Sequence, residues 1–237
     1  MLLEIAVFNI SAALQAQKAG ADRLELCENP LEGGTTPSYG TLRLAAEKIA
    51  IPVFPIIRPR GGDFLYGDEC YEVIKRDLLL CKDLGFPGAV LGLLNQDGSI
   101  SLGRTAQLVE LAYPMEITFH RAFDRAKDPL VAMQALIECG ISRILTSGQH
   151  PNVSEGIGLI QKLITVAKKE IIILPGSGVR SATIPMLMEA GAVELHSSAR
   201  QLVPSKMDYT VHSMNESLDT WGVDTAEIKA MKALISK

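Results

Sequence analysis

Short apolar runs recur along the chain, and most of them end in a polar cluster. IPVFPIIR runs into PRGGDF, MEITF into HRAFD, RIL into TSGQ, IIIL into PGSGV and VEL into HSSAR. A buried parallel strand is a nearly continuous apolar stretch, because helices cover both faces of its sheet. Chemically versatile residues at the C-terminal ends of successive parallel strands are typical of a (β/α)8 barrel, whose functional groups collect on that face.

Four glycines give the repeat that this fold requires. Gly20, Gly85, Gly140 and Gly191 each end a helix-like stretch and precede a strand-like one, a place that suits the left-handed position after a helix. Their spacing corresponds to two strand–helix units of about 30 residues each, so they mark the even strands. The odd strands are then expected at residues 2–8, 52–58, 115–120 and 171–175. The sequence predicts an α/β fold with a single TIM-type barrel domain over residues 1–237.

One stretch does not follow this repeat. A long loop is expected at residues 199–222, after the eighth strand, with scattered large apolar residues between 204 and 222: Met207, Tyr209, Met214, Leu218 and Trp221. Long loops in compact domains are usually functional or packed against something. Packing on its own barrel and contact with a second subunit are equally compatible with this pattern.

Composition narrows the class of protein. The chain has 237 residues, of which 47% are hydrophobic and 21% charged, as in ordinary soluble globular proteins. A net charge of −4 argues against a nucleic-acid partner, since such proteins usually carry a basic face. The N-terminus lacks the basic start of a signal peptide, and no apolar run approaches the ~20 residues that span a bilayer. We therefore expect a cytoplasmic protein without a membrane partner, and reduced cysteines.

Alternation along the strands predicts a charged barrel interior. In ADRLELC, Leu24 and Leu26 should face the helices, so Arg23, Glu25 and Cys27 should face the barrel axis. The same alternation points several other charged residues inward: Glu4, Arg58, Glu116, His120, Arg143, Glu194 and His196. The deeper charges are expected to pair in a buried network, because an unpaired buried charge costs several kcal/mol. The upper residues, at the strand ends, are expected to surround one cavity.

Two motifs at strand ends supply candidate chemistry. PRGGDF offers Arg58, Arg60 and Asp63; the arginines suit a carboxylate or phosphate ligand, although an Arg–Asp pair could simply stiffen the loop. HRAFD offers His120, Arg121 and Asp124. Histidine is the usual acid or base near neutral pH, and Asp124 could orient it or hold Arg121. The predicted catalytic residues are Glu25, His120, Asp124 and His196.

The last strands carry an expected anion site. In this fold a phosphate site is often built from the loops after strands seven and eight, with backbone N–H groups and a helix N-terminus. These loops supply Gly176, Ser177, Gly178, Ser197 and Ser198, and TSGQ adds Ser147 and Gln149 to the rim.

A metal site is the other chemical possibility. Cys27 with His120 or His196 could bind Cu(I), which prefers thiolate and imidazole ligands; Cys27 could equally be a small buried apolar residue. No lysine lies at an expected strand end for a Schiff base, and no HExxH motif occurs.

The strings ADRLELC, EGGTTPSYG, IRPRGGDFLY, TFHRAFD, RILTSGQ and PGSGV, in this order, resemble the CutC copper-homeostasis family over residues 3–203. The resemblance implies a TIM-type barrel, a cytoplasmic location, a homodimer and a role in copper homeostasis. It implies no particular reaction. Copper binding in the family is attributed to cysteines, for which this chain offers Cys27.

Two hypotheses remain open at this point. In one, the barrel binds and buffers copper ions; in the other, it is an enzyme that acts on a small anionic or phosphorylated metabolite. Glu25 and His120 would then be the acid–base pair, and the arginines and the loops after the last two strands would hold the anion. The residues favour the enzyme, and the family resemblance favours copper.

Overall fold

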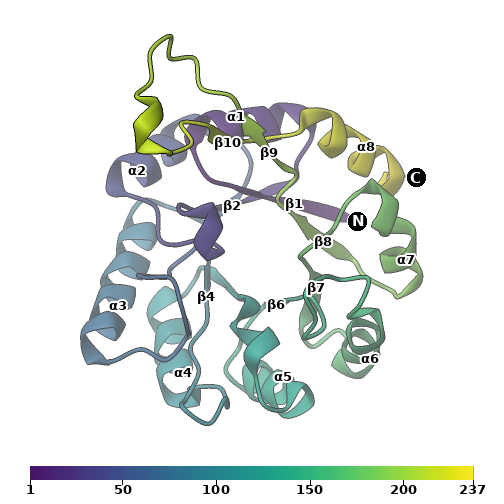
Figure 1. The fold of residues 1–237 in the computed structure, drawn as a ribbon. Coiled ribbons are helices and arrows are strands. Elements are labelled where there is room, and N and C mark those ends of the chain that lie inside the picture. Colours follow the sequence, from purple (N-terminus) through teal and green to yellow (C-terminus); the bar gives the residue numbers. More distant parts are fainter. Residues whose placement is uncertain (237) are drawn as a thin grey trace.

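The computed structural model describes residues 1–236, apart from the side chain of His212. Eight strands surround a common interior, and helices cover their outer side (Figure 1). The strands are β1 (Leu2–Val7), β2 (Arg23–Leu26), β3 (Val53–Pro55), β4 (Gly88–Leu91), β5 (Glu116–Phe119), β6 (Arg143–Thr146), β7 (Ile172–Pro175) and β8 (Glu194–Ser197). The main helices are α1 (Ile10–Ala19), α2 (Tyr39–Lys48), α3 (Asp68–Asp83), α4 (Leu102–Ala112), α5 (Pro129–Glu138), α6 (Ile157–Ala167), α7 (Ile184–Glu189) and α8 (Thr225–Ile235).

All neighbouring barrel strands run parallel. Their hydrogen bonds form two four-stranded sheets, in the orders β3-β2-β1-β8 and β4-β5-β6-β7. The sheets meet at one parallel bridge, where the N–H of Ile57 donates to the carbonyl of Val90 at 2.7 Å. On the other side β7 lies beside β8, without a hydrogen-bonded ladder between these two strands. The predicted α/β barrel architecture is confirmed.

The glycine repeat also matches the structure. Gly20, Gly85, Gly140 and Gly191 all adopt left-handed backbone conformations, with φ of 103°, 81°, 78° and 91°. Each lies just after a helix, and the even strands begin at Arg23, Gly88, Arg143 and Glu194, the third residue after each glycine. The odd strands lie within the predicted ranges but are shorter. β1, β3 and β5 end earlier, because the last predicted residues already belong to the loops that form the functional face, and β7 begins one residue later.

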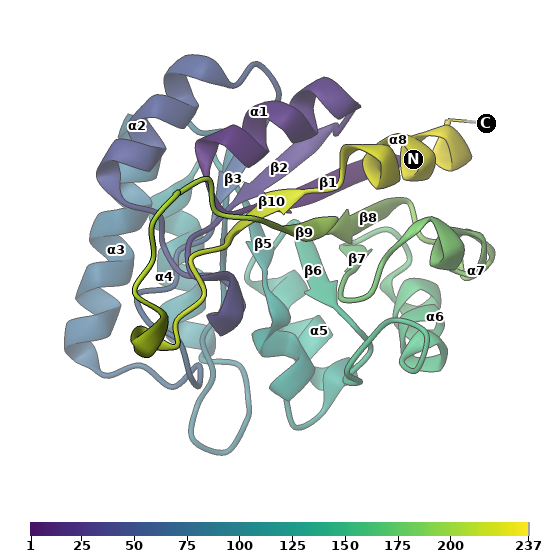
Figure 2. The ribbon, with the colours of Figure 1, turned by 45° about the horizontal axis from the view of Figure 1, so that its top comes forward.

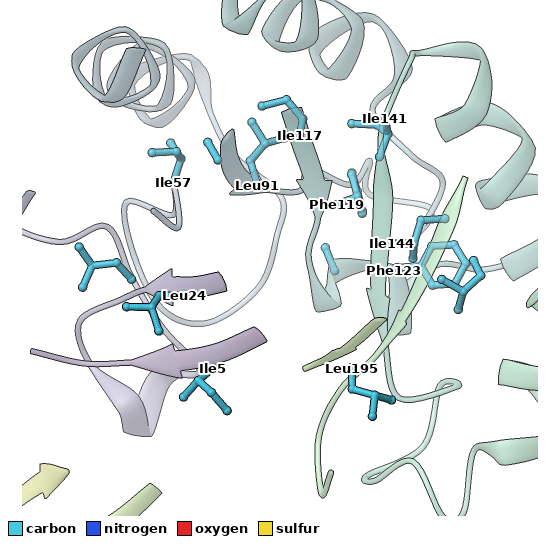
Figure 3. Packing of buried hydrophobic residues seen from close by; sticks show 14 of the residues in the cluster. Ile5, Leu24, Ile57, Leu91, Ile117, Phe119, Phe123, Ile141, Ile144 and Leu195 are labelled. Atoms are coloured by element: carbon cyan, nitrogen blue, oxygen red, sulfur yellow. The ribbon is translucent and has the colours of Figure 1, made fainter. Parts of the chain in front are cut away.

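The outward-facing strand residues and the inner sides of the helices form the main hydrophobic core. Ile5, Leu24, Leu91, Ile117 and Leu195 are among the strand residues that pack in it (Figure 3). Each such buried side chain contributes about 1.5–3 kcal/mol relative to an exposed one. A smaller apolar cluster inside the barrel consists of Cys27, Phe54, Ile56 and Val90. Most of the charged residues that the alternation points inward are buried in the interior as well, together with small or apolar residues such as Ala6 and Leu145.

The segment expected as a loop over residues 199–222 instead contains a hairpin. β9 (Arg200–Val203) pairs antiparallel with β10 (Thr220–Val223), and the Asn9 side chain donates to the Trp221 carbonyl at 2.8 Å. Residues 204–219, yellow-green in Figures 1 and 2, extend away from these two strands. Their large apolar side chains are exposed: Met207, Tyr209, Val211, Met214 and Leu218.

Among residues 1–236, none of the helices has both the length and the apolar character needed to cross a bilayer.

Candidate active site at the C-terminal end of the barrel

A cavity of about 1100 Å³ opens among the C-terminal ends of the strands and the loops that follow them. Glu25, Arg58, His120 and His196 all line it. They come from the ends of four different strands, β2, β3, β5 and β8. The structure thus brings together the four residues that the strand register places at one mouth.

A layer of paired charges lies beneath the cavity. Arg23 donates from Nε to Glu4 and from Nη2 to Glu194, the latter at 2.5 Å. Arg143 contacts Glu116 at 2.6 Å and Glu194 at 3.3 Å. These side chains are almost wholly buried except that of Glu116, which is 55% exposed at the other end of the barrel. The predicted deep network is present, and every buried charge in it has a partner of opposite sign, as burial requires.

His196 links this layer to the cavity. Its Nδ1 lies 2.7 Å from Oε1 of Glu4, and its Nε2 lies 3.8 Å from Oε2 of Glu25. Burial lowers the pKa of His196, but the hydrogen bond to Glu4 and the charge of Glu25 outweigh it, so the pKa is raised. Burial raises the pKa of Glu4, yet the bond from His196 and the charge of Arg23 bring it down to about 2. Glu4 is therefore a fixed anion, and His196 holds its proton more strongly than a free imidazole.

Glu25 has the opposite environment. Burial raises its pKa more than the nearby His196 charge lowers it, and Glu4 raises it further. Oε2 accepts a hydrogen bond from the Cys27 thiol at 3.4 Å, whereas Oε1 has no hydrogen-bond partner among residues 1–236. A carboxyl group with a raised pKa and a free oxygen at a cavity is a candidate general base or acid.

His120 is held as a neutral ring. Its Nδ1 accepts the backbone N–H of Ala122 at 3.2 Å, so the ring proton must lie on Nε2. Burial and then the charge of Arg58 lower the pKa of His120 to about 3. The ring packs at 4.9 Å from that of Phe64, and Gly92 has no room for a side chain, since a Cβ there would lie 2.5 Å from Nδ1. Nε2 is buried and has no acceptor in the described chain.

Arg58 is a buried cation whose hydrogen bonds all go to backbone carbonyls. Nη1 donates to Glu32 at 2.5 Å and to Gly34 at 2.9 Å, and Nη2 donates to Gly62 at 2.8 Å. The side chain lies over the ring of Phe64 at 5.0 Å. No carboxylate forms an ion pair with it in the described residues, and its Nε has no acceptor. With only 4% of the residue exposed, this charge lacks an anion.

The other residues of PRGGDF form an exposed pair. Arg60 contacts Asp63 at 2.7 Å, with side chains 40% and 70% exposed, and lies over the ring of Tyr66 at 4.9 Å. Asp63 lines the mouth of the cavity, whereas Arg60 does not. The structure therefore favours the alternative in which this pair stiffens the loop.

Asp124 is enclosed by hydrogen-bond donors. It accepts from Arg121 Nε at 2.7 Å, from the N–H of Gln149 at 3.1 Å, and from the N–H and hydroxyl of Ser147 at 3.1 and 3.0 Å. Thr146 donates to it as well. The carboxylate thus joins the loops after β5 and β6. Asp124 and Arg121 line the cavity, while Ser147 and Gln149 lie behind them.

The loops after β7 and β8 form the opposite wall, to which Ser177, Gly178, Ser197 and Ser198 contribute. Two of the hydroxyls are used within the loops: Ser177 donates to Pro151 and Ser197 to Val179, each at 2.7 Å. These loops offer backbone N–H groups and the Ser198 hydroxyl to a ligand.

Gly176 lies outside the cavity lining but keeps space at its floor. A Cβ at Gly176 would lie 2.4 Å from Leu145 and 3.1 Å from His196. The helix that follows β7, α7, begins only at Ile184 after a short turn and has six residues. A helix N-terminus therefore does not directly follow the Gly176–Gly178 loop, and the backbone N–H groups of the loop itself are the nearest donors that the prediction named.

Two arginines of this wall were missed by the sequence reasoning. Arg180 and Arg200 both line the cavity, and Nη1 of Arg180 is buried without an acceptor. Arg200 lies over Trp221 at 5.1 Å and donates to the carbonyl of Pro30 at 3.2 Å. The signal was present in the sequence, because both follow the polar clusters PGSGV and HSSA directly.

The predicted copper ligand, Cys27, is a buried thiol. Cys27 is 1% exposed, and burial followed by the charge of Glu25 raises the pKa of its thiol well above the ordinary value. Copper requires the thiolate. Across the described chain, no group of three or more His, Cys, Asp or Glu residues is arranged to hold a metal ion.

Comparison with known proteins identifies the family. The CutC family model matches residues 1–201. The CutC family protein of Serratia proteamaculans is 44% identical over 237 residues, covering 97% of this chain and 94% of that protein; the one from Photorhabdus laumondii is 44% identical over 241 residues, covering 99% and 97%. The crystal structure of the putative copper homeostasis protein CutC from Streptococcus agalactiae superposes with a TM-score of 0.79 at 32% identity, covering 84% of this chain and 98% of that one. Phosphoribosyl anthranilate isomerase from Thermus thermophilus, at 12% identity and a TM-score of 0.58 over 100% of this chain and 98% of its own, shares the fold alone. The chain belongs to the CutC family.

Proposed function

We propose that this protein is an enzyme that carries out acid–base chemistry on a small anionic metabolite at the C-terminal mouth of the barrel. The observation that carries the proposal is Arg58, a buried guanidinium without a carboxylate partner in the described chain, on the same cavity as the Glu25 carboxyl group. Leaving a buried charge uncompensated costs several kcal/mol. An anionic ligand would supply the missing charge.

The rest of the wall supports an anionic ligand. Arg180 has a buried, unbonded Nη1 atom on the cavity, and Arg200 lines the same side. The loop at Ser177 and Gly178 adds backbone groups to the same wall. Charge-assisted hydrogen bonds from arginine contribute about 1.5–3 kcal/mol each. The positive side of the cavity is therefore suited to a phosphate or carboxylate group.

Thermal unfolding with a panel of phosphorylated and carboxylated metabolites tests this proposal. A ligand at 100 times its Kd stabilises the folded state by about 2.7 kcal/mol, which raises Tm by roughly 5–10 °C for a domain of this size. Arg180→Gln should weaken binding about 10- to 100-fold by removing one such bond. Arg43→Gln is the matched control, because Arg43 lies exposed on α2 and pairs only with Glu47. If no anionic compound raises Tm, or if both variants respond alike, the proposal is wrong.

Direct copper binding is the second candidate, because the related structure from Streptococcus agalactiae is described as a putative copper homeostasis protein. Cys27 would have to lose its proton and its bond to Glu25 to act as a ligand. A Cu(I) titration of the wild-type protein and of Cys27→Ser under reducing conditions tests this candidate. Tight binding that the substitution abolishes would support copper. Equal affinities of the two proteins would exclude Cys27 as the ligand.

A further inference from the structure

The cavity holds two groups with complementary chemistry. His120 is a neutral imidazole that can only donate from Nε2, because its Nδ1 is occupied by the Ala122 N–H. Glu25 is a buried carboxyl group with one oxygen, Oε1, free of protein hydrogen bonds among the described residues. Both line the same cavity. One is suited to stabilise a developing negative charge on oxygen, and the other to take a proton.

The position of the His120 ring is fixed by its neighbours. The ring packs against Phe64, and it approaches Gly92 so closely that a side chain there would clash with it. A buried donor without an acceptor costs about 1–3 kcal/mol, so the folded protein maintains Nε2–H at an energetic cost that a ligand acceptor would remove. A neutral imidazole can donate its N–H to a carbonyl oxygen and so stabilise the negative charge that develops there; enolising enzymes use neutral imidazoles in this way.

His196 and Glu4 lie next to Glu25 and influence its proton affinity. The imidazole of His196 lies between the two carboxyl groups, 2.7 Å from Glu4 and 3.8 Å from Glu25. Burial raises the pKa of Glu25, and the charge of His196 offsets part of that rise. We assign Glu4 as a positioning residue that acts through His196, since His196 lines the cavity and Glu4 does not.

From this geometry we infer that the site enolises a phosphorylated hydroxy aldehyde or hydroxy ketone, with Glu25 moving the proton on carbon and His120 bonded to the carbonyl oxygen. This inference rests on the proposed function, because it requires that the cavity bind an anionic metabolite. The phosphate would lie against Arg180, Gly178 and Ser198, which line the cavity wall formed by the loops after β7 and β8.

The steps balance without a further reactant. The ionised Glu25 takes a proton from the carbon next to the carbonyl group. The C–H electron pair forms a carbon–carbon double bond, and the carbonyl π pair moves to oxygen, where Nε2–H of His120 stabilises the charge. Glu25, now a carboxylic acid, returns a proton to the same carbon, which restores the substrate. Return of the proton to the former carbonyl carbon gives the isomer, provided that the proton of the neighbouring hydroxyl group passes to the former carbonyl oxygen, so that the hydroxyl and carbonyl groups exchange places.

Hydrogen exchange measured by proton NMR in D2O tests this inference. Dihydroxyacetone phosphate, ribulose 5-phosphate and fructose 6-phosphate are incubated with the wild-type protein, and loss of the C–H signal beside the carbonyl group is followed. We expect exchange of at least one compound above the protein-free rate. Glu25→Gln should reduce that rate about 10²- to 10⁴-fold. Because it is purified in the same way, this variant also reveals any contaminating isomerase.

Two substitutions of His120 separate its donor from its structural role. In His120→Asn, the amide oxygen replaces Nδ1 as acceptor for Ala122 but no donor reaches the position of Nε2, so exchange should fall about 10²- to 10³-fold. In His120→Gln, the amide nitrogen reaches that position, so part of the rate should return. Arg43→Gln should exchange at the wild-type rate.

The outcomes distinguish the two levels of the proposal. If none of the three sugars exchanges, although anionic compounds still raise Tm through Arg180, the enolisation is wrong and the proposed function stands. If no anionic compound binds at all, both are wrong. If the Glu25→Gln variant exchanges hydrogen as fast as the wild-type protein, then Glu25 is not the base. The wild-type measurement tests the enolisation even if a variant fails to fold.

Discussion

The neutral state of His120 predicts a pH dependence of stability that its removal should abolish. The pKa of His120 is about 3 in the folded protein, compared with 6.5 for an unperturbed imidazole. Below pH 6.5 the unfolded chain therefore binds a proton that the folded protein does not, and the unfolded state is favoured as the pH falls. The stability that the protein gains from keeping His120 neutral is therefore fully present above pH 6.5 and is progressively lost as the pH falls towards 3.

Proton linkage gives the size of the effect. Between pH 7 and pH 5, His120 should lower the free energy of unfolding by about 2 kcal/mol, with a slope near 1.4 kcal/mol per pH unit below pH 6. His120→Asn keeps an acceptor for the Ala122 N–H but cannot titrate. The difference between the two proteins isolates His120, since the contributions of Glu4, Glu25 and His196 are common to both.

The assay is urea unfolding at pH 7, 6 and 5 of the wild-type protein, His120→Asn and the control His150→Asn. His150 is an exposed loop residue, so its replacement should leave the wild-type pH dependence unchanged. If His120→Asn loses as much stability as the wild type between pH 7 and pH 5, then His120 takes up a proton in the folded protein. The description of its Nε2–H as a neutral donor would then be refuted.

Three further outcomes are expected. Arg23→Met leaves Glu4 and Glu194 as buried carboxylates without their guanidinium, so the free energy of unfolding should fall by about 3–5 kcal/mol in denaturant titrations; a loss below 1 kcal/mol would contradict the buried network. Asp124→Asn places an amide among donors that need an acceptor, so the free energy of unfolding should fall by about 1–3 kcal/mol. Replacement of a residue with a purely catalytic role would not lower it. The homodimer that the family resemblance implies would bury the segment that extends from the hairpin, on which Met214 is 61% exposed, so Met214→Asp should give a monomer of 25.6 kDa in light scattering; a wild-type protein that is itself monomeric would exclude this contact.

Much of the barrel could be predicted from the chain because local and global signals agree. The glycines after the helices fix where the even strands begin, and alternation from that point assigns each strand residue to one face. This is why the inward direction of Arg23, Glu25 and His196 could be obtained without coordinates. A shift of one residue would have placed Leu24 in the interior and these charges among the helices.

What could not be predicted depends on loop conformation. Asp124 and Ser147 were separate candidates in the sequence, and only the path of the loops after β5 and β6 shows that they bind each other. Arg180 and Arg200 follow turns whose direction no periodicity fixes, so their position on the cavity was missed. The hairpin of β9 and β10 was missed for a related reason: its strands have four residues each and include a single buried residue, Val223, which is too little for an apolar signal.

The charged layer under the cavity has a consequence for how acidity is set. Glu4 contacts Arg23 on one side and His196 on the other, and His196 faces Glu25. The proton affinity of the carboxyl group at the mouth is therefore tuned from the closed end of the barrel, by side chains that a ligand never meets. Two homologues with identical mouths would differ in their optimal pH if one of them exchanged a single ion pair in this lower layer.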